Sequence, residues 1–235
     1  MINIPKQLRW EYRKLNRERL SALKGAFCSD IMYFRMPKVA SQTITQALNE
    51  MENTNATVIP HSLSPAMVRR ILQFGEKSFR FTFVRNPYTR FVSAYKWATR
   101  NNIDPLGYEV DVQQHSIISR YSSIDSFAVA LPSIYQEHRK HLLHFIPQTE
   151  WVTYKGQLLI DFWGKLETLS ESLTLLSAEG FNLPIVFGAN TKNSAPSMAV
   201  ENNDEYAHRY GLSDDARHAI STFYENDFSV FNYKK

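Results

Sequence analysis

Apolar runs and amphipathic stretches alternate along the first part of the chain. Runs rich in strand-forming residues start at Ile31 and cover 57–60 and 79–84. Each run is followed by apolar residues at helical spacing, in stretches that begin near Ser41, at Ser62 or Ser64, and after 85–90. Strands that alternate with helices predict an α/β fold, a single domain whose central parallel β-sheet is flanked by helices.

The rest of the chain has a less regular pattern. It predicts helices over 124–131, 133–144, 167–178 and 213–227, a buried strand over 157–162, a long loop over 182–197, and an aromatic tail over 228–233 that packs back on the domain. No linker rich in Gly, Ser or Pro divides the 235 residues, so we expect one domain over 1–235.

A basic segment opens the chain. Between Lys6 and Lys24, basic residues gather beside apolar residues at roughly helical spacing: Arg9, Arg13, Lys14, Arg17 and Arg19 beside Leu8, Tyr12, Leu15 and Leu20. We expect 1–25 to form a basic amphipathic helix that packs on the domain and keeps a solvated face. The alternative is a segment that binds nucleic acid or a membrane surface.

Composition limits the class of protein and of partner. Hydrophobic residues make up 43% of the chain and aromatic residues 13%, which predicts a packed core and excludes disorder. The formal charge of +4 favours an anionic partner, but Lys and Arg are scattered outside the first segment, so nucleic acid is not the expected partner. A single cysteine, Cys28, together with the lack of a secretory signal or membrane-spanning run, predicts a cytoplasmic protein.

Two stretches have the composition of anion sites. In the first, a helix that begins at Ser41 points its first N–H groups at the loop, where Lys38 adds positive charge; the alternative is an ordinary turn with a chance lysine. In the second, Arg85 leaves a strand and Ser93 follows about two helical turns later, which suits a phosphate monoester. A nucleotide with phosphates at both ends of its ribose would satisfy both sites.

The two stretches resemble motifs of the sulfotransferases that use 3′-phosphoadenosine 5′-phosphosulfate (PAPS), especially the carbohydrate branch and its bacterial relatives. The run 37–43 resembles the loop for the 5′-phosphosulfate, and the run from Arg85 to Ser93 resembles the 3′-phosphate motif; weaker similarity covers 144–148, 161–167, 192–194 and 224–233. The resemblance implies a P-loop-like nucleotide-binding sulfotransferase fold. It also implies that the donor is held by Lys38, Val39, Ala40, Ser41, Gln42, Thr43, Arg85, Ser93, Lys192 and Ser194.

Sulfuryl transfer to a hydroxyl, here of a carbohydrate or other small molecule, needs a base and a positive charge at the leaving oxygen. Lys38 suits the charge. His61 suits the base, because it follows a strand end at the same edge of the sheet and a histidine at a similar place is the proposed base in the carbohydrate branch. A plain loop histidine is the alternative, with Glu76 and Glu109 as less well placed bases.

Several further expectations complete the hypothesis. His144 and Gln148 are candidates for binding acceptor hydroxyls, although Pro147 equally suits a structural turn. No metal is expected, because the chain lacks zinc-type spacing, and His138, His141 and His144 on one helix face have no carboxylates beside them. The lack of a Walker loop argues against a kinase or NTPase. Ala40 and Gln42 stand where the family usually has Gly and Ser or Thr, so a relative that binds PAPS without turnover is the second hypothesis. A basic nucleic-acid-binding protein is the third.

Overall fold

A sheet of parallel strands organises one of the two compact units into which the chain divides. The computed structural model describes residues 6–51, 54–101, 109–184 and 211–235. The first unit comprises the described residues up to Val84 and those from Glu150 to 184. The second comprises the described residues from Arg85 to Thr149 and those from 211 onward.

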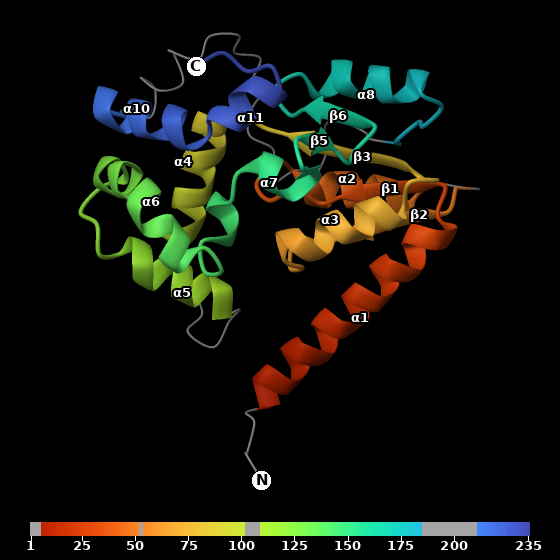
Figure 1. The fold of residues 1–235 in the computed structure, drawn as a ribbon, viewed down its shortest axis with the longest axis horizontal. Coiled ribbons are helices and arrows are strands. Elements are labelled where there is room, and N and C mark those ends of the chain that lie inside the picture. The colour runs from red at the N-terminus through yellow and green to blue at the C-terminus, as the bar shows by residue number, and fades with distance from the viewer. Residues whose placement is uncertain (1–5, 52–53, 102–108, 185–210) are drawn as a thin grey trace. The chain divides into compact units, whose positions relative to one another are not determined.

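The sheet of the first unit has four parallel strands in the order β2-β1-β3-β6 (Figure 1). They are β1 (Ile31–Phe34), β2 (Ala56–Ile59), β3 (Phe79–Val84) and β6 (Phe162–Lys165), and a separate antiparallel pair is made by β4 (Thr153–Tyr154) and β5 (Gln157–Leu158). The connections from β1 to β2 and from β2 to β3 run in opposite directions, so the topology reverses between β1 and β3. Open parallel sheets bind ligands beyond the carboxyl ends of the strands at such a reversal.

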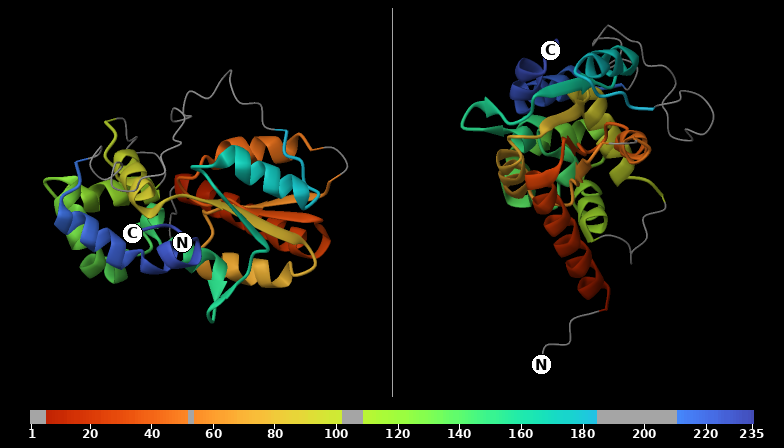
Figure 2. Two further views of the ribbon diagram at one scale, coloured as in Figure 1. Left: turned by 90° about the horizontal axis from the view of Figure 1, so that it is seen from above. Right: turned by 90° about the vertical axis from the view of Figure 1, so that its right-hand side faces the viewer.

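Helices cover both faces of this sheet. They are α1 (Lys6–Cys28), α2 (Ser41–Asn49), α3 (Pro65–Phe74) and α8 (Leu169–Ala178). The left view of Figure 2 shows α2 and α8 on one face and α3 on the other. Helix α1 packs against β2 and α3, and Gly25 permits the close approach, because a Cβ there would lie 2.0 Å from Oγ1 of Thr57. Among residues 16–28 of this helix, Ala22 and Ala26 are buried, whereas Leu20, expected on the packed face, is 67% exposed.

The second unit contains helices packed around aromatic side chains. They are α4 (Pro87–Ala98), α5 (Glu109–Ile118), α6 (Ile124–His138), the 3₁₀ turn η1 (Leu143–Phe145), α10 (Asp214–Phe223) and α11 (Glu225–Val230); α7 (Gln148–Val152) runs from this unit into the first. Helix α10 packs on α6 and α4. The rings of Phe91, Phe127 and Phe145 lie with centroids 5.0 to 5.9 Å apart and form the centre of this packing.

The α/β class and the first three strands are as predicted, but three element boundaries are wrong. The expected strand over 157–162 is divided, because Gly156, at φ +79°, turns the chain into the β4-β5 hairpin and the sheet strand begins only at Phe162. The two helices expected on either side of Pro132 form the single α6, which buries Phe127, Leu131 and Tyr135 along one face. The helix expected over 213–227 ends at Phe223.

The remaining fold expectations have mixed outcomes. In the aromatic tail, Phe228 and Phe231 are buried as expected. Most of the loop expected over 182–197 lies outside the described residues, and the single domain over 1–235 stays a prediction. Over 6–51, 54–101, 109–184 and 211–235, no helix combines the length and apolar character needed to cross a membrane.

Candidate active site

The loop between β1 and α2 has an unusual backbone. Two of its residues other than glycine have positive φ, Lys38 at 68° and Ala40 at 54°. Ala40 is also the residue before α2, and its side chain makes no capping hydrogen bond to the helix. Left-handed residues next to a helix start bring backbone N–H groups to one side, which is a common way to bind an anion. The backbone of this loop is compatible with an anion site, and the anion site itself stays a prediction.

The left-handed conformation of Ala40 leads to a prediction about stability. A Cβ disfavours this conformation by about 1–2 kcal/mol, whereas glycine adopts it freely but loses more chain entropy on folding. We expect Ala40→Gly to raise the free energy of unfolding by about 0.5–1 kcal/mol in urea titrations. Ala47→Gly, within α2, is the control and should lower it by about 1 kcal/mol. A loss of stability in both variants would contradict the left-handed assignment.

Several contacts fix the ends of this loop. Nε of Arg35 donates to Oγ of Ser41 at 3.2 Å, so the loop that contains Lys38 carries a second cation. The hydroxyl of Thr82, on β3, donates to the carbonyl of Phe34 at 2.7 Å, at the last residue of β1. Burial raises the pKa of the nearby Tyr33 hydroxyl, and the charge of Arg35 opposes this shift. The loop thus starts from a rigid, buried strand end and carries two positive side chains.

His61 lies at the same edge of the sheet as this loop. It follows the end of β2, the strand beside β1, and the N–H of Arg35 donates to the carbonyl of Ile59 at 2.9 Å, which ties the two exit segments together. The ring is half-buried and its Nδ1 atom is buried. Glu76, the backup base, precedes β3 and so lies at the opposite, amino edge, where it is exposed. The placement of His61 suits a base better than that of Glu76.

The second anion motif forms the start of α4 in the second unit. Asn86 caps the helix by accepting a hydrogen bond from the N–H of Tyr88 at 2.9 Å, and Pro87 begins it. Arg85, just before the cap, donates from Nε to the hydroxyl of Thr89 at 2.9 Å. Thr89 and the half-buried Ser93 lie four residues apart and share one face of α4. Arg85 is therefore folded along the face that carries Ser93.

The two candidates for acceptor binding have polar partners inside the second unit. Gln148 is fully buried: its Oε1 accepts from the N–H of Arg85 and its Nε2 donates to the carbonyl of Arg85, both at 2.9 Å. His144 is 8% exposed, and its Nδ1 lies 3.0 Å from Nε2 of Gln114. Gln148 thus contacts the backbone of the residue assigned to the 3′-phosphate, which favours a supporting role over contact with an acceptor.

The remaining predicted residues fall in different places. Lys192 and Ser194 lie outside the described residues, and Glu109 is exposed at the start of α5. His138 ends α6 while His144 belongs to η1, so the histidines do not share one helix face as expected. Within the described ranges, no group of three or more His, Cys, Asp or Glu residues is arranged to hold a metal ion.

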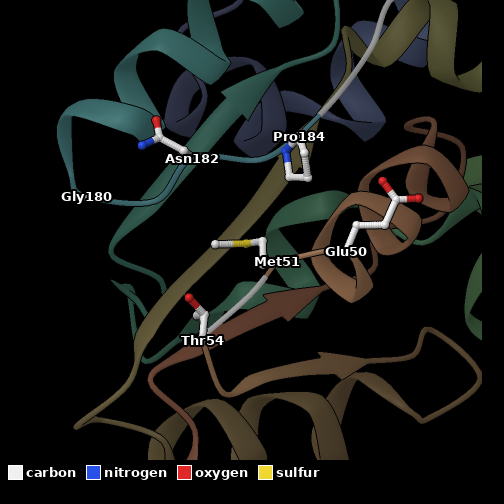
Figure 3. Close-up of a pocket in the computed structure, with 6 residues that line it drawn as sticks. All are labelled: Glu50, Met51, Thr54, Gly180, Asn182 and Pro184. Atoms are coloured by element: carbon white, nitrogen blue, oxygen red, sulfur yellow. The ribbon is translucent and has the colours of Figure 1, made fainter.

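A hollow of about 330 Å³ lies elsewhere in the first unit (Figure 3). It is found at the carboxyl end of α2, whereas the Lys38 loop precedes the amino end of that helix. Its lining residues are Glu50, Met51, Thr54, Gly180, Asn182 and Pro184. These described lining residues include a carboxylate and no basic side chain, so they do not suit an anionic ligand.

Sequence reasoning overlooked three residues of these motifs. Thr89 could have been found, because it stands four residues after Arg85 and four before Ser93, the spacing of one helix face. Arg35 stands three residues before Lys38 in a loop already chosen for its charge. Asp227, which accepts hydrogen bonds from Gln148, has no such signal, since it is one of two acids in an aromatic stretch far along the chain.

Comparison with family models matches most of the chain. The model of a group described as the sulfotransferase family matches residues 28–234, which is most of the chain and includes both anion motifs. Comparisons with curated proteins and with solved structures found no match.

Proposed function

Because this chain belongs to the sulfotransferase family, we propose that it transfers the sulfuryl group of PAPS to a hydroxyl group of an acceptor. The family membership supports sulfuryl transfer in general, and PAPS is the donor typical of the family. The observation that carries the choice of donor is the loop before α2, with its two left-handed residues and its two cations. In this proposal the loop binds the 5′-phosphosulfate, and the Arg85 motif binds the 3′-phosphate.

The first unit would supply the chemistry. PAPS brings a sulfuryl group joined to phosphate through an oxygen, and transfer forms a new bond from sulfur to the acceptor oxygen as the bond to that phosphate breaks. The positive charge of Lys38 stabilises the phosphate oxygen that leaves. His61, at the end of the neighbouring strand, takes the proton of the acceptor hydroxyl. Backbone N–H groups at 39–42 and the hydroxyls of Ser41 and Thr43 hold the phosphosulfate in place.

The second unit would recognise the other end of the donor. Arg85, held by Thr89, offers its guanidinium to the 3′-phosphate, and Ser93 adds a hydroxyl from the same helix face. Lys192 and Ser194 remain proposed donor contacts by their resemblance alone. His144 remains a proposed acceptor contact, and a carbohydrate remains the proposed acceptor. The cytoplasmic location expected from the lone Cys28 stays a prediction.

A second candidate function is nucleotide binding without turnover. It is favoured by Ala40, whose left-handed backbone carries a strain that the glycine usual in the family would not have. In that case the protein would bind PAPS and its spent form, 3′-phosphoadenosine 5′-phosphate (PAP), but would release no sulfated product.

Binding of PAP tests the nucleotide assignment and the expected absence of a metal. We expect PAP to bind with the same affinity before and after treatment with EDTA, because Lys38, Arg35 and Arg85 supply the positive charge that a magnesium ion would otherwise supply. Titration calorimetry on the full chain measures this directly, with adenosine as the ligand that lacks both phosphates. Loss of PAP binding on chelation would contradict the metal-free assignment, and equal binding of adenosine would contradict the anion sites.

A further inference from the structure

The backbone of Arg85 is held by a side chain from a distant part of the sequence. The amide of Gln148 bonds to both the N–H and the carbonyl of Arg85, so it restrains the peptide groups on both sides of that residue. Asn86 then caps α4 immediately afterwards, and Thr89 accepts from the Nε of Arg85. The backbone of Arg85 and the Nε nitrogen of its guanidinium are therefore both held by hydrogen bonds.

Asp227 in turn holds Gln148 through hydrogen bonds. Its Oδ2 accepts from the N–H of Gln148 at 2.7 Å, and its Oδ1 accepts from the N–H and the hydroxyl of Thr149 at 2.8 and 2.7 Å. The Nε2 of Gln148 also lies 3.5 Å from Oδ2 of Asp227. Asp227 is fully buried. Burial raises the pKa of its carboxyl, while the charge of Arg90 and the hydrogen bonds from residues 148 and 149 oppose that shift.

The segment before Gln148 is fixed as well. Nη2 of Arg90, a fully buried residue of α4, donates to the carbonyls of His144 and Ile146 at 3.1 and 2.6 Å. The hydroxyl of Tyr224 donates to the carbonyl of Phe145 at 2.8 Å. Partners from α4 and from the end of the chain thus hold the segment that presents the Gln148 amide. These bonds restrain the segment, because each displaced group would lose its hydrogen bond away from water. Nε and Nη1 of Arg90 are themselves buried without a hydrogen-bond partner among the described residues.

We propose that Gln148, supported by Asp227, is a positioning residue that sets the orientation of Arg85 and thereby the preference of this protein for a 3′-phosphorylated nucleotide. The inference rests on the proposed function, because it assigns Arg85 to the 3′-phosphate. A guanidinium that is already held in place binds a phosphate more tightly than a mobile one. The mobile guanidinium loses conformational entropy when it binds, and this loss lowers the affinity. The residue acts through Arg85 and does not itself contact the nucleotide.

The test compares PAP with adenosine 5′-monophosphate, which lacks the 3′-phosphate, by titration calorimetry on the full chain. Gln148→Met keeps the volume of the side chain and removes both bonds to Arg85. We expect the preference for PAP over the monophosphate to fall about tenfold in this variant. Asp227→Asn, which keeps the shape but loses one acceptor oxygen, should lower the preference about threefold.

Gln114→Met is the matched control. Gln114 is also a fully buried glutamine of the second unit, but it bonds to His144 and not to Arg85, so its variant should keep the wild-type preference. If Gln148 has a purely structural role, Gln148→Met should weaken the binding of PAP and of the monophosphate equally. The ratio of the two affinities would then stay unchanged, and that result would overturn the inference. If Gln148→Met does not fold, an unchanged ratio in Asp227→Asn overturns it instead. A wild-type protein without any preference for PAP would overturn the proposed function of Arg85, and this inference with it.

Discussion

Replacing His61 with alanine is expected to lower the turnover number for sulfuryl transfer by about a hundredfold or more, while the affinity for PAP stays near the wild-type value. The reason is that a positioned general base contributes roughly this factor to a proton transfer. The side chain has no assigned role in binding the nucleotide. Steady-state rates at saturating PAPS, together with calorimetry with PAP, give both quantities. His141→Ala, which removes another half-buried histidine without a proposed role, is the control.

The pH profile gives a sharper reading of the same variant. A histidine base works only when neutral, so the wild-type rate should fall on the acidic side with an apparent pKa of roughly 6–7, and this limb should be missing in His61→Ala. Lys38→Ala should behave differently and lose both turnover and affinity for PAPS, because its charge acts before and during transfer. Full turnover and an unchanged acidic limb in His61→Ala would contradict the assignment, and His144 would be the next base to examine.

Replacing Arg85 with alanine should weaken PAP binding by about 2 kcal/mol, which is roughly thirtyfold in the dissociation constant. The loss arises because a forked, charged contact to the 3′-phosphate disappears, and so binding of adenosine 5′-monophosphate should change little. The thermal unfolding midpoint should change little, since Arg85 is only partly buried. Calorimetry with both nucleotides and a thermal melt measure these effects.

Two further variants support the reading of Arg85. Ser93→Ala should show the same selective loss in a milder form, because it removes one neutral hydrogen bond. Arg120→Ala removes the same charge from an exposed position of the second unit and should leave both affinities unchanged. Equal weakening of PAP and of the monophosphate by Arg85→Ala would show that the residue does not distinguish the 3′-phosphate.

The sequence was most informative where local pattern and packing agree. The run from Phe79 to Val84 is rich in strand-forming residues and becomes β3 with the predicted bounds, because both faces of this strand are covered. The pattern was least informative where a tertiary effect overrides a local preference. Pro132 lies inside α6 although it removes a backbone hydrogen bond, since the apolar face on both sides of it is buried.

In the candidate site, too, local patterns could be predicted from the sequence and long-range contacts could not. Lys38, His61 and Arg85 could be chosen from the sequence because each follows a strand end, and the ends of parallel strands meet at one edge of a sheet. The bonds from Gln148 to Arg85 join residues 63 positions apart, and those from Asp227 to Gln148 join residues 79 positions apart. No local pattern encodes such pairs, so a glutamine that supports an arginine could not be told from one that binds an acceptor.

Incubation of the full chain with PAPS and a panel of sugars, phenols and hydroxyl-bearing lipids tests the central claim most directly. Mass spectrometry reads both the sulfated acceptor and the PAP released with it, and the Lys38→Ala variant gives the background. We expect at least one acceptor class, with carbohydrates first, to gain a sulfuryl group in equal amount to the PAP formed, and the variant to form neither product. Tight binding of PAP without a sulfated product from any acceptor class would contradict the assigned activity and favour nucleotide binding without turnover.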